Sequence, residues 1–361
     1  MKEKVTHPEE GRMIHGGDVY RNVVQYDFSI SVDPTDRPDS LRAALLEAID
    51  RVGEYPDLEQ RQFRETVAEF EGLSPDQIWG GNGASELIMG LAYALRPRRA
   101  LLPAPCFSGY RRALEASGNC DVAEVALRDE DNFDLTERFV ERVAEEFDVV
   151  FVTNPNNPTG RLIAPSVMEK LLSRCVETQT ALVVDECFLR LSHGGVSVRD
   201  RVGEFPNLYV IDSLTKLFGI PGVRVGYAIS ADANIARLRE KLPEWNLSTF
   251  ATAAARACLK TSSPTDHIAR ALSLIGEERE YLARSLRGMG LRVVDSDANF
   301  LLFEGPEKLA ERALERGLLI RDCSNFSGLT KGFFRIAVRK RVENELLVRT
   351  IAEIVGKEHE D

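Results

Sequence analysis

Short apolar segments rich in β-branched residues alternate with helical segments through the middle of this 361-residue chain. The strand-like segments are 99–102, 122–127, 149–153, 181–185, 208–211 and 223–229. The clearest helical segments are 84–95, 165–177 and an earlier one, 40–49, in which Ser40 is expected to cap the first turn. Strands that alternate with helices form a mostly parallel sheet covered on both faces. The sequence therefore predicts an α/β fold.

The pattern changes after about residue 232, where long helical segments are followed by a new group of strands. The helical segments are 233–242, 249–259, 268–289 and, at the end, 343–355; the strand-like segments are 291–294, 299–303, 317–320 and 334–338. This length and order predict a second, smaller α+β domain. We expect an irregular N-terminal arm that packs with the small domain, a large domain and a small C-terminal domain, with bounds 1–38, 39–255 and 256–361.

Charge and composition limit the classes of partner. The chain has 46 basic and 57 acidic residues and a net charge of −11, which argues against a nucleic-acid partner. A few local arginines can still attract a small anionic substrate. No apolar run approaches the ~18–20 residues that cross a bilayer, and the first residues do not resemble a signal peptide, so we expect no membrane partner and a cytoplasmic location. The six cysteines form no C-x-x-C pair and the histidines are scattered, which predicts reduced thiols and no metal site.

Two asparagine- and glycine-rich motifs are candidates for ligand contact, since open α/β sheets bind ligands at the carboxyl ends of their strands. The motif Trp-Gly-Gly-Asn-Gly-Ala-Ser-Glu, residues 79–86, opens a helix and could offer its free N–H groups to a phosphate. A plain glycine turn before a capped helix explains this motif equally well. The motif Asn-Pro-Asn-Asn-Pro-Thr-Gly, residues 154–160, has more amides than a turn needs, which suggests contact with a ligand.

Two further motifs supply an acid and a lysine. Asp185 follows an apolar strand, where a lone carboxylate needs a cationic partner such as a protonated ring nitrogen, unless it caps a helix or forms a salt bridge. Lys216 lies among hydroxyl and apolar residues just past the next strand, which favours a nucleophilic amine over a surface lysine. Ser213 and Arg224 flank it as candidate phosphate ligands.

Taken together, Asn-Pro-Thr-Gly, Asp-Glu after a strand, and Ser-x-x-Lys with Arg eight residues beyond the lysine resemble the fold-type I, class I/II aminotransferase family. The resemblance extends along the whole chain. It implies a mostly parallel seven-stranded sheet between helices, with a smaller α+β domain. It also implies pyridoxal 5′-phosphate as cofactor, a small anionic amino-acid substrate and a homodimer with shared active sites.

The resemblance also implies a role for individual residues. Lys216 is expected to bind the cofactor aldehyde, and Asp185 to hold the pyridinium proton, so that both are catalytic. Asn157 is expected to donate to the ring 3′-oxygen and Phe107 to stack on the ring. The expected ligands of the cofactor phosphate are Gly83, Ala84, Ser85, Ser213, Arg224 and, from the neighbouring subunit, Tyr55. Arg335 is expected to bind the substrate α-carboxylate through two parallel N–H···O hydrogen bonds.

Two branches of the family match, one of threonine-phosphate decarboxylases and one of histidinol-phosphate aminotransferases. His-Gly-Gly at 15–17 and the segment 319–326 resemble the decarboxylases, although an ordinary turn explains the first. His15, Arg321 and Arg339 are therefore candidates for a substrate phosphate, unless the arginines only serve solubility. The substrate we expect is L-threonine O-3-phosphate.

The chain departs from the family pattern at one position. Many members have Asp-Glu-Ala-Tyr where this chain has Asp-Glu-Cys-Phe, so Phe188 cannot donate to the 3′-oxygen as the tyrosine does. A regulator that only senses pyridoxal phosphate is a third alternative. The acidic balance and the lack of a basic DNA-binding arm argue against it.

Overall fold

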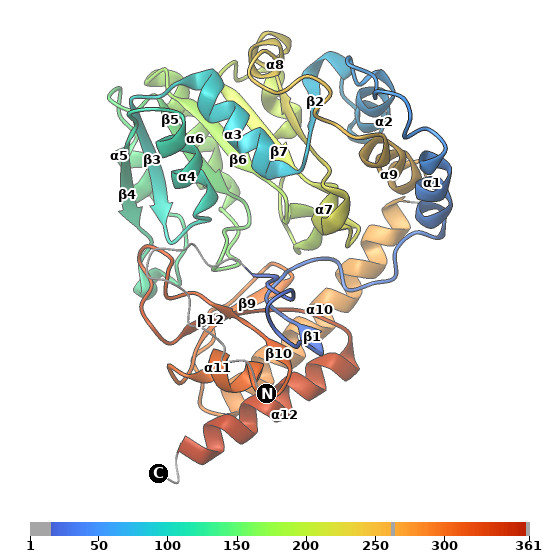
Figure 1. Cartoon of the computed structure of the whole chain (residues 1–361). Coiled ribbons are helices and arrows are strands. Elements are labelled where there is room, and N and C mark those ends of the chain that lie inside the picture. Colours follow the sequence, from blue (N-terminus) through green and yellow to red (C-terminus); the bar gives the residue numbers. More distant parts are fainter. Residues whose placement is uncertain (1–15, 261–263, 359–361) are drawn as a thin grey trace.

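A seven-stranded sheet forms the centre of the larger part of the computed structural model, which describes residues 16–260 and 264–358 (Figure 1). Its strands are β2 (Ile78–Gly81), β3 (Arg99–Ala104), β4 (Asp121–Ala126), β5 (Val149–Thr153), β6 (Ala181–Asp185), β7 (Leu208–Asp212) and β8 (Gly226–Ser230). They lie in the order β2-β8-β7-β6-β5-β3-β4. Strand β8 runs in the opposite direction to the other six strands, which are parallel to one another. The predicted α/β fold with a mostly parallel seven-stranded sheet is confirmed.

Helices cover both faces of this sheet, and alternate residues of each central strand enter two different hydrophobic cores. In β5, Val149 and Phe151 pack on one face and Val150 and Val152 on the other. The helices of the first core are α3 (Ala84–Leu95), α4 (Gly109–Ala116) and α8 (Asp232–Arg239). The helices that contribute to the second core include α1 (Asp39–Ile49), α2 (Arg61–Glu71), α5 (Glu137–Arg142), α6 (Pro165–Glu177) and α9 (Thr249–Leu259). Burial on both faces explains why these strands are almost continuously apolar.

A second, three-stranded antiparallel sheet lies below the first in Figure 1. Its strands are β9 (Phe300–Glu304), β11 (Arg321–Asp322) and β12 (Phe333–Ala337), in the order β11-β12-β9. A third core joins this sheet to α10 (Pro264–Gly288), α11 (Leu309–Leu314) and α12 (Arg341–Glu358). The long helix α10 runs from beside α9 down to this smaller sheet (Figure 1). Among the described residues, no helix is both long and apolar enough to cross a membrane.

The N-terminal arm passes between the two sheets and touches both. Its strand β1 (Tyr26–Asp27) pairs in parallel with β10 (Leu318–Leu319). The Phe28 N–H donates to the Leu319 carbonyl at 2.7 Å, on the side of the smaller sheet. The Asp33 N–H donates to the Lys216 carbonyl at 2.9 Å, on the side of the larger one. The arm therefore helps to enclose the space between them.

The structure differs from three local predictions. Helix α1 begins at Asp39, and the Ser40 hydroxyl donates to the Ala257 carbonyl at 2.9 Å instead of capping the helix. Segment 291–294 forms no strand and contributes one isolated bridge, Val293 to Phe303. Strand β2 is missing from the prediction because it contains two glycines. A Cβ at Gly80 would lie 2.6 Å from the Phe63 ring, so packing against α2 requires glycine there.

Candidate active site

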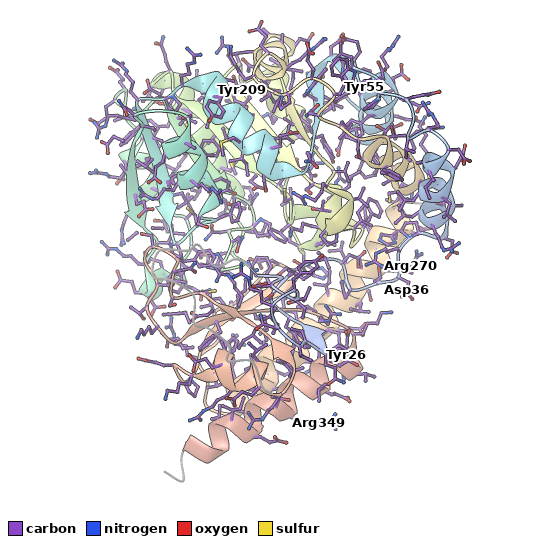
Figure 2. All side chains as sticks on the ribbon, viewed as in Figure 1. Tyr26, Asp36, Tyr55, Tyr209, Arg270 and Arg349 are labelled. Carbon is purple, nitrogen blue, oxygen red and sulfur yellow. The ribbon has the colours of Figure 1, made fainter. Side chains whose placement is uncertain are left out.

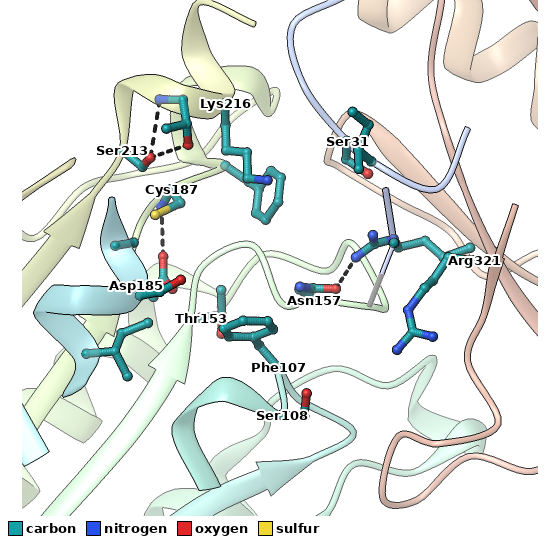
Figure 3. A pocket seen from close by; sticks show the side chains of 18 of the residues that line it. Ser31, Phe107, Ser108, Thr153, Asn157, Asp185, Cys187, Ser213, Lys216 and Arg321 are labelled. Atoms are coloured by element: carbon teal, nitrogen blue, oxygen red, sulfur yellow. Dashed lines mark hydrogen bonds between the residues drawn. The ribbon is translucent and has the colours of Figure 1, made fainter. Parts of the chain in front are cut away.

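A cavity lies between the carboxyl ends of β5, β6 and β7 and the hairpin β11–β12 (Figure 3). Most of the residues predicted for the site line it: Ala84, Ser85, Phe107, Asn157, Asp185, Ser213, Lys216, Arg224, Arg321 and Arg335. Residues from the larger sheet and from the smaller sheet face each other across this space (Figure 3). The site therefore depends on the way the two sheets are held together.

Lys216 lies in the short helix α7 (Leu214–Leu217), which follows β7 directly. Burial lowers the pKa of its ammonium group, and the positive charges of Arg335 and Arg224 lower it further. The Lys216 Nζ lies 5.6 Å from the centre of the Phe188 ring. This environment favours a neutral amine, which is the nucleophilic form.

Asp185 is the last residue of β6, and its side chain is only 6% exposed. The Tyr110 hydroxyl donates to Asp185 Oδ2 at 2.7 Å, and the Cys187 N–H donates to Oδ1 at 3.0 Å. Thr153 is the partner of Asp185 in the register of β5 with β6. The carboxylate is therefore held by polar groups at the floor of the cavity and can accept a further hydrogen bond.

The start of helix α3 forms a cradle of suitable size and charge for a phosphate. Gly83, at the helix N-cap, has φ = 78°, and a Cβ there would lie 2.4 Å from the Arg224 guanidinium. The Ser213 hydroxyl accepts from the Thr215 N–H at 3.2 Å and caps α7. The free N–H groups of α3, two serine hydroxyls and one arginine thus converge, as an anion requires. Together with Lys216 and Asp185, they fit pyridoxal phosphate.

Asn157 and Arg335 connect the larger sheet to the smaller one. The Arg335 Nη1 donates to Asn157 Oδ1 at 2.5 Å, and its Nη2 donates to the Ser29 carbonyl at 2.9 Å. Because arginine can only donate, this contact fixes the orientation of the Asn157 amide. Asn157 Nδ2 is then the atom left to donate into the cavity.

Arg321 and Arg335 are direct partners in the register of β11 with β12, and both are buried. Burial lowers the pKa of Arg335 to about 10 and also lowers the pKa of Arg321. In the described part of the chain, neither forms a salt bridge with a carboxylate. The buried Nε of Arg335 has no hydrogen-bond partner there. Two buried guanidinium groups without acidic partners mark a place for an anionic ligand.

Two further predicted residues, Arg339 and Tyr55, lie outside this cavity. Arg339 donates to Glu343 Oε1 at 2.7 Å and does not line the cavity described. Tyr55 is 81% exposed, lies on the outer surface in Figure 2, and has its ring centre 4.9 Å from that of Trp245. His15 is outside the described residues. Of the two candidates for the substrate phosphate that lie within residues 16–260 and 264–358, the structure brings Arg321 into the cavity beside Arg335.

A buried charge network lies on the opposite side of the ends of β6 and β7. Its members are Glu71, Glu186, Asp212, Arg190, Arg199 and Tyr227. The Arg199 guanidinium lies 2.7 Å from Glu186 and 3.1 Å from Asp212. Asp212 Oδ1 also accepts from the Ser213 N–H at 2.6 Å. The network thus fixes the residues that follow Asp185 and precede Ser213.

Asp212 stands out among the carboxylates of this network. Burial raises its pKa to about 6, although the positive charges of Arg199 and Arg190 oppose the shift. Three carboxylates share only two guanidinium groups, so the network has an excess of negative charge. Asp212 is the group that this excess leaves most ready to bind a proton.

Sequence reasoning missed several polar residues that line the cavity, among them Ser31, Tyr110 and Thr153. Tyr110 lies three residues after Phe107, and its N–H donates to the Phe107 carbonyl at 3.2 Å, so this spacing is a usable signal. Thr153 ends a predicted strand, as Asp185 does. Ser31 lies in the irregular arm, and nothing in its sequence neighbourhood points to the site.

Comparison with known proteins agrees with this geometry. The family model described as aminotransferase class I and II matches residues 24–351. Threonine-phosphate decarboxylase from Salmonella typhimurium is 31% identical over 337 residues, covering 91% of both chains. Histidinol-phosphate aminotransferase from Thermococcus gammatolerans is 31% identical over 342 residues, covering 93% of this chain and 95% of the other. The crystal structure of histidinol-phosphate aminotransferase from Clostridium acetobutylicum has a TM-score of 0.83 at 28% identity, covering 91% of this chain and 99% of that one.

Proposed function

Because this chain belongs to the class I and II aminotransferase family of pyridoxal-phosphate-dependent enzymes, we propose that it acts on a phosphorylated amino acid. The reaction we propose is the decarboxylation of L-threonine O-3-phosphate to (R)-1-aminopropan-2-yl phosphate and CO2, in cobalamin synthesis. The similarity to the Salmonella threonine-phosphate decarboxylase supports this reaction.

The pair Arg321 and Arg335 carries the proposal. A substrate with one carboxylate and one phosphate needs two cationic partners, and these two guanidinium groups lie side by side in the cavity. Arg335 is the carboxylate ligand in this proposal, and Arg321 is the phosphate ligand. Their burial strengthens both contacts, because water competes less for a buried charge.

When bound, pyridoxal phosphate supplies an electron-accepting ring beside the substrate α-carbon. Asp185 would hold the proton of the ring nitrogen, and Phe107 would pack against the ring. Asn157 Nδ2 would donate to the 3′-oxygen. Phe188 presents an apolar edge where many relatives have a hydroxyl. Lys216 Nζ, whose lowered pKa keeps it able to take up and give a proton, supplies the proton that replaces the carboxylate at the α-carbon.

An aminotransferase acting on histidinol phosphate, with 2-oxoglutarate as acceptor, is the second candidate. The Thermococcus aminotransferase supports this candidate, because its sequence identity to this chain, 31%, equals that of the Salmonella decarboxylase. The same arginine pair would then bind the two carboxylates of the acceptor. Lys216 would remove a proton from the α-carbon instead of delivering one.

One experiment with two arms separates these reactions. The purified protein with pyridoxal phosphate receives O-phospho-L-threonine alone, and released CO2 is measured. In parallel it receives L-histidinol phosphate with 2-oxoglutarate, and glutamate is measured. We expect CO2 in the first arm and no glutamate in the second. Glutamate without CO2 would establish the aminotransferase and overturn the decarboxylase.

We further propose a homodimer in which Tyr55 reaches the cofactor phosphate of the neighbouring subunit. The high exposure of Tyr55 on its own protomer supports this arrangement, since a side chain that serves another site must be accessible. A cytoplasmic location and the division into arm, large domain and small domain at residues 38/39 and 255/256 remain predictions.

A further inference from the structure

We propose that Tyr110 is a positioning residue for Asp185: its hydroxyl, fixed by Thr153, holds the carboxylate toward the ring nitrogen of the cofactor. This inference rests on the proposed role of Asp185. It assigns a role to a residue that packing alone does not explain, because a phenylalanine would fill the same space.

The hydroxyl of Tyr110 bridges the ends of two neighbouring strands of the sheet. Thr153 and Asp185 are partners in the parallel register of β5 with β6. Tyr110 comes from α4, on the face that carries the first core, and its hydroxyl lies 2.7 Å from both Thr153 Oγ1 and Asp185 Oδ2. All three side chains are buried, so water does not compete for these contacts.

The direction of the hydrogen bonds follows from the donors available. The phenol group has one hydroxyl hydrogen to donate, and an ionised carboxylate has none. Tyr110 therefore donates to Asp185 and accepts from the Thr153 hydroxyl, which is the first donor in this series of two hydrogen bonds. Burial and the charge of Asp185 raise the pKa of Tyr110 well above its usual value, so the phenol keeps its proton. Asp185 Oδ2 then always faces a hydrogen-bond donor.

The packing of Tyr110 fixes its hydroxyl in this position. Its ring stacks on Phe151 at 5.4 Å and meets Phe107 edge-on at the same centroid distance. Phe107 is the residue expected to cover the cofactor ring. The segment from Phe107 to Tyr110, which leads into α4, would thus reach the cofactor twice: directly through Phe107, and from Tyr110 through Asp185. A Cβ at Gly109 would lie 2.2 Å from the Phe107 ring, so a larger residue at this position would displace that ring.

The test compares two cofactors that differ at one ring atom. The apoprotein is titrated with pyridoxal phosphate and with an analogue that has carbon in place of the ring nitrogen, and both dissociation constants are measured. The preference for pyridoxal phosphate reports the contact of Asp185 with the nitrogen. We expect Tyr110→Phe to reduce this preference about tenfold, the effect of losing one hydrogen bond to a charged group. We expect Thr153→Val to reduce it less.

Two controls separate the possible failures. Tyr209→Phe removes a hydroxyl from the same hydrophobic core, at a residue that does not line the cavity, and should leave the preference unchanged. Asp185→Asn should abolish the preference. If wild type itself shows no preference, the role proposed for Asp185 fails. If wild type and Asp185→Asn differ as expected but Tyr110→Phe weakens both cofactors equally, Tyr110 only packs and the inference is overturned.

Discussion

Replacing Asp212 by asparagine should change how the stability of this protein depends on pH. Asp212 is buried in the charge network behind β6 and β7, and burial raises its pKa from 3.8 to about 6. A carboxyl whose pKa is raised on folding stabilises the folded state fully below its unfolded value. This stabilisation is lost as the pH rises through about 6. Above that pH the ionised Asp212 adds a buried negative charge to the network in the folded protein, whereas in the unfolded chain the same carboxylate is solvated by water.

The size of the effect follows from the shift. Raising a pKa from 3.8 to about 6 costs roughly 3 kcal/mol once the group is ionised, at about 1.4 kcal/mol for each pH unit. The unfolding entropy of about 2.1 cal/mol/K per residue gives roughly 0.8 kcal/mol/K for this chain of 361 residues. The change therefore corresponds to about 4 °C in Tm.

The assay is thermal unfolding of wild type and Asp212→Asn at several pH values. The asparagine weakens the contacts with Arg199 and Ser213 by an amount that does not depend on pH. The informative quantity is therefore how the difference in Tm between the two proteins changes with pH. This difference should move by about 4 °C in favour of the variant between about pH 4 and about pH 7.5. Asp200→Asn, at an exposed carboxylate beside Arg199, makes the same change of charge and should show no such trend. A difference that stays constant with pH for Asp212→Asn would refute the reasoning.

Four further predictions concern the site. Lys216→Ala should abolish turnover and the irreversible attachment of cofactor by borohydride, which mass spectrometry of the intact protein measures, while cofactor still binds reversibly. Gly83→Ala should weaken cofactor binding at least tenfold, because its Cβ would displace the Arg224 guanidinium; unchanged affinity would mean that the cradle lies elsewhere. Arg321→Gln should lower kcat/KM for phosphothreonine by about 10²-fold and leave that for threonine nearly unchanged; an equal loss for both substrates would remove Arg321 from the phosphate. Mixing inactive Lys216→Ala and Tyr55→Phe subunits should restore activity in heterodimers, and a fully active monomer in sedimentation would rule out shared sites.

Local patterns were sufficient for the parts of the fold that bury both faces of a strand or one face of a helix. Strands 149–153 and 181–185 and helices 84–95, 165–177 and 249–259 have the bounds that the sequence predicts. Each contains a complete apolar pattern between turn-forming residues, so distant contacts are not needed to define it. The residues at the ends of these strands then converge because the strands are parallel neighbours.

Residues whose role depends on distant partners could not be found in this way. Arg339 matches a family position, yet its guanidinium donates to the Asp27 carbonyl at 3.0 Å, 312 residues earlier in the chain, as well as to Glu343. Arg199 lies 13 residues beyond Glu186 and 128 beyond Glu71, and only the folded chain brings the three together. Segment 291–294 has the composition of a strand but pairs with β9 at a single bridge, Val293 with Phe303, and the length of that pairing is a property of the sheet and not of the segment.

The register of β11 with β12 has a consequence for the behaviour of the protein without its substrate. Arg321 and Arg335 are neighbours in an antiparallel pair, and like charges in that arrangement repel each other. An anion bridging them removes this repulsion, so anion binding and the folding of the smaller sheet are thermodynamically linked. Phosphate and sulfate in a buffer should therefore compete with the substrate and, at the same concentrations, raise the melting temperature. Inhibition constants and stability measured in different buffers are then comparable only when the anion is the same.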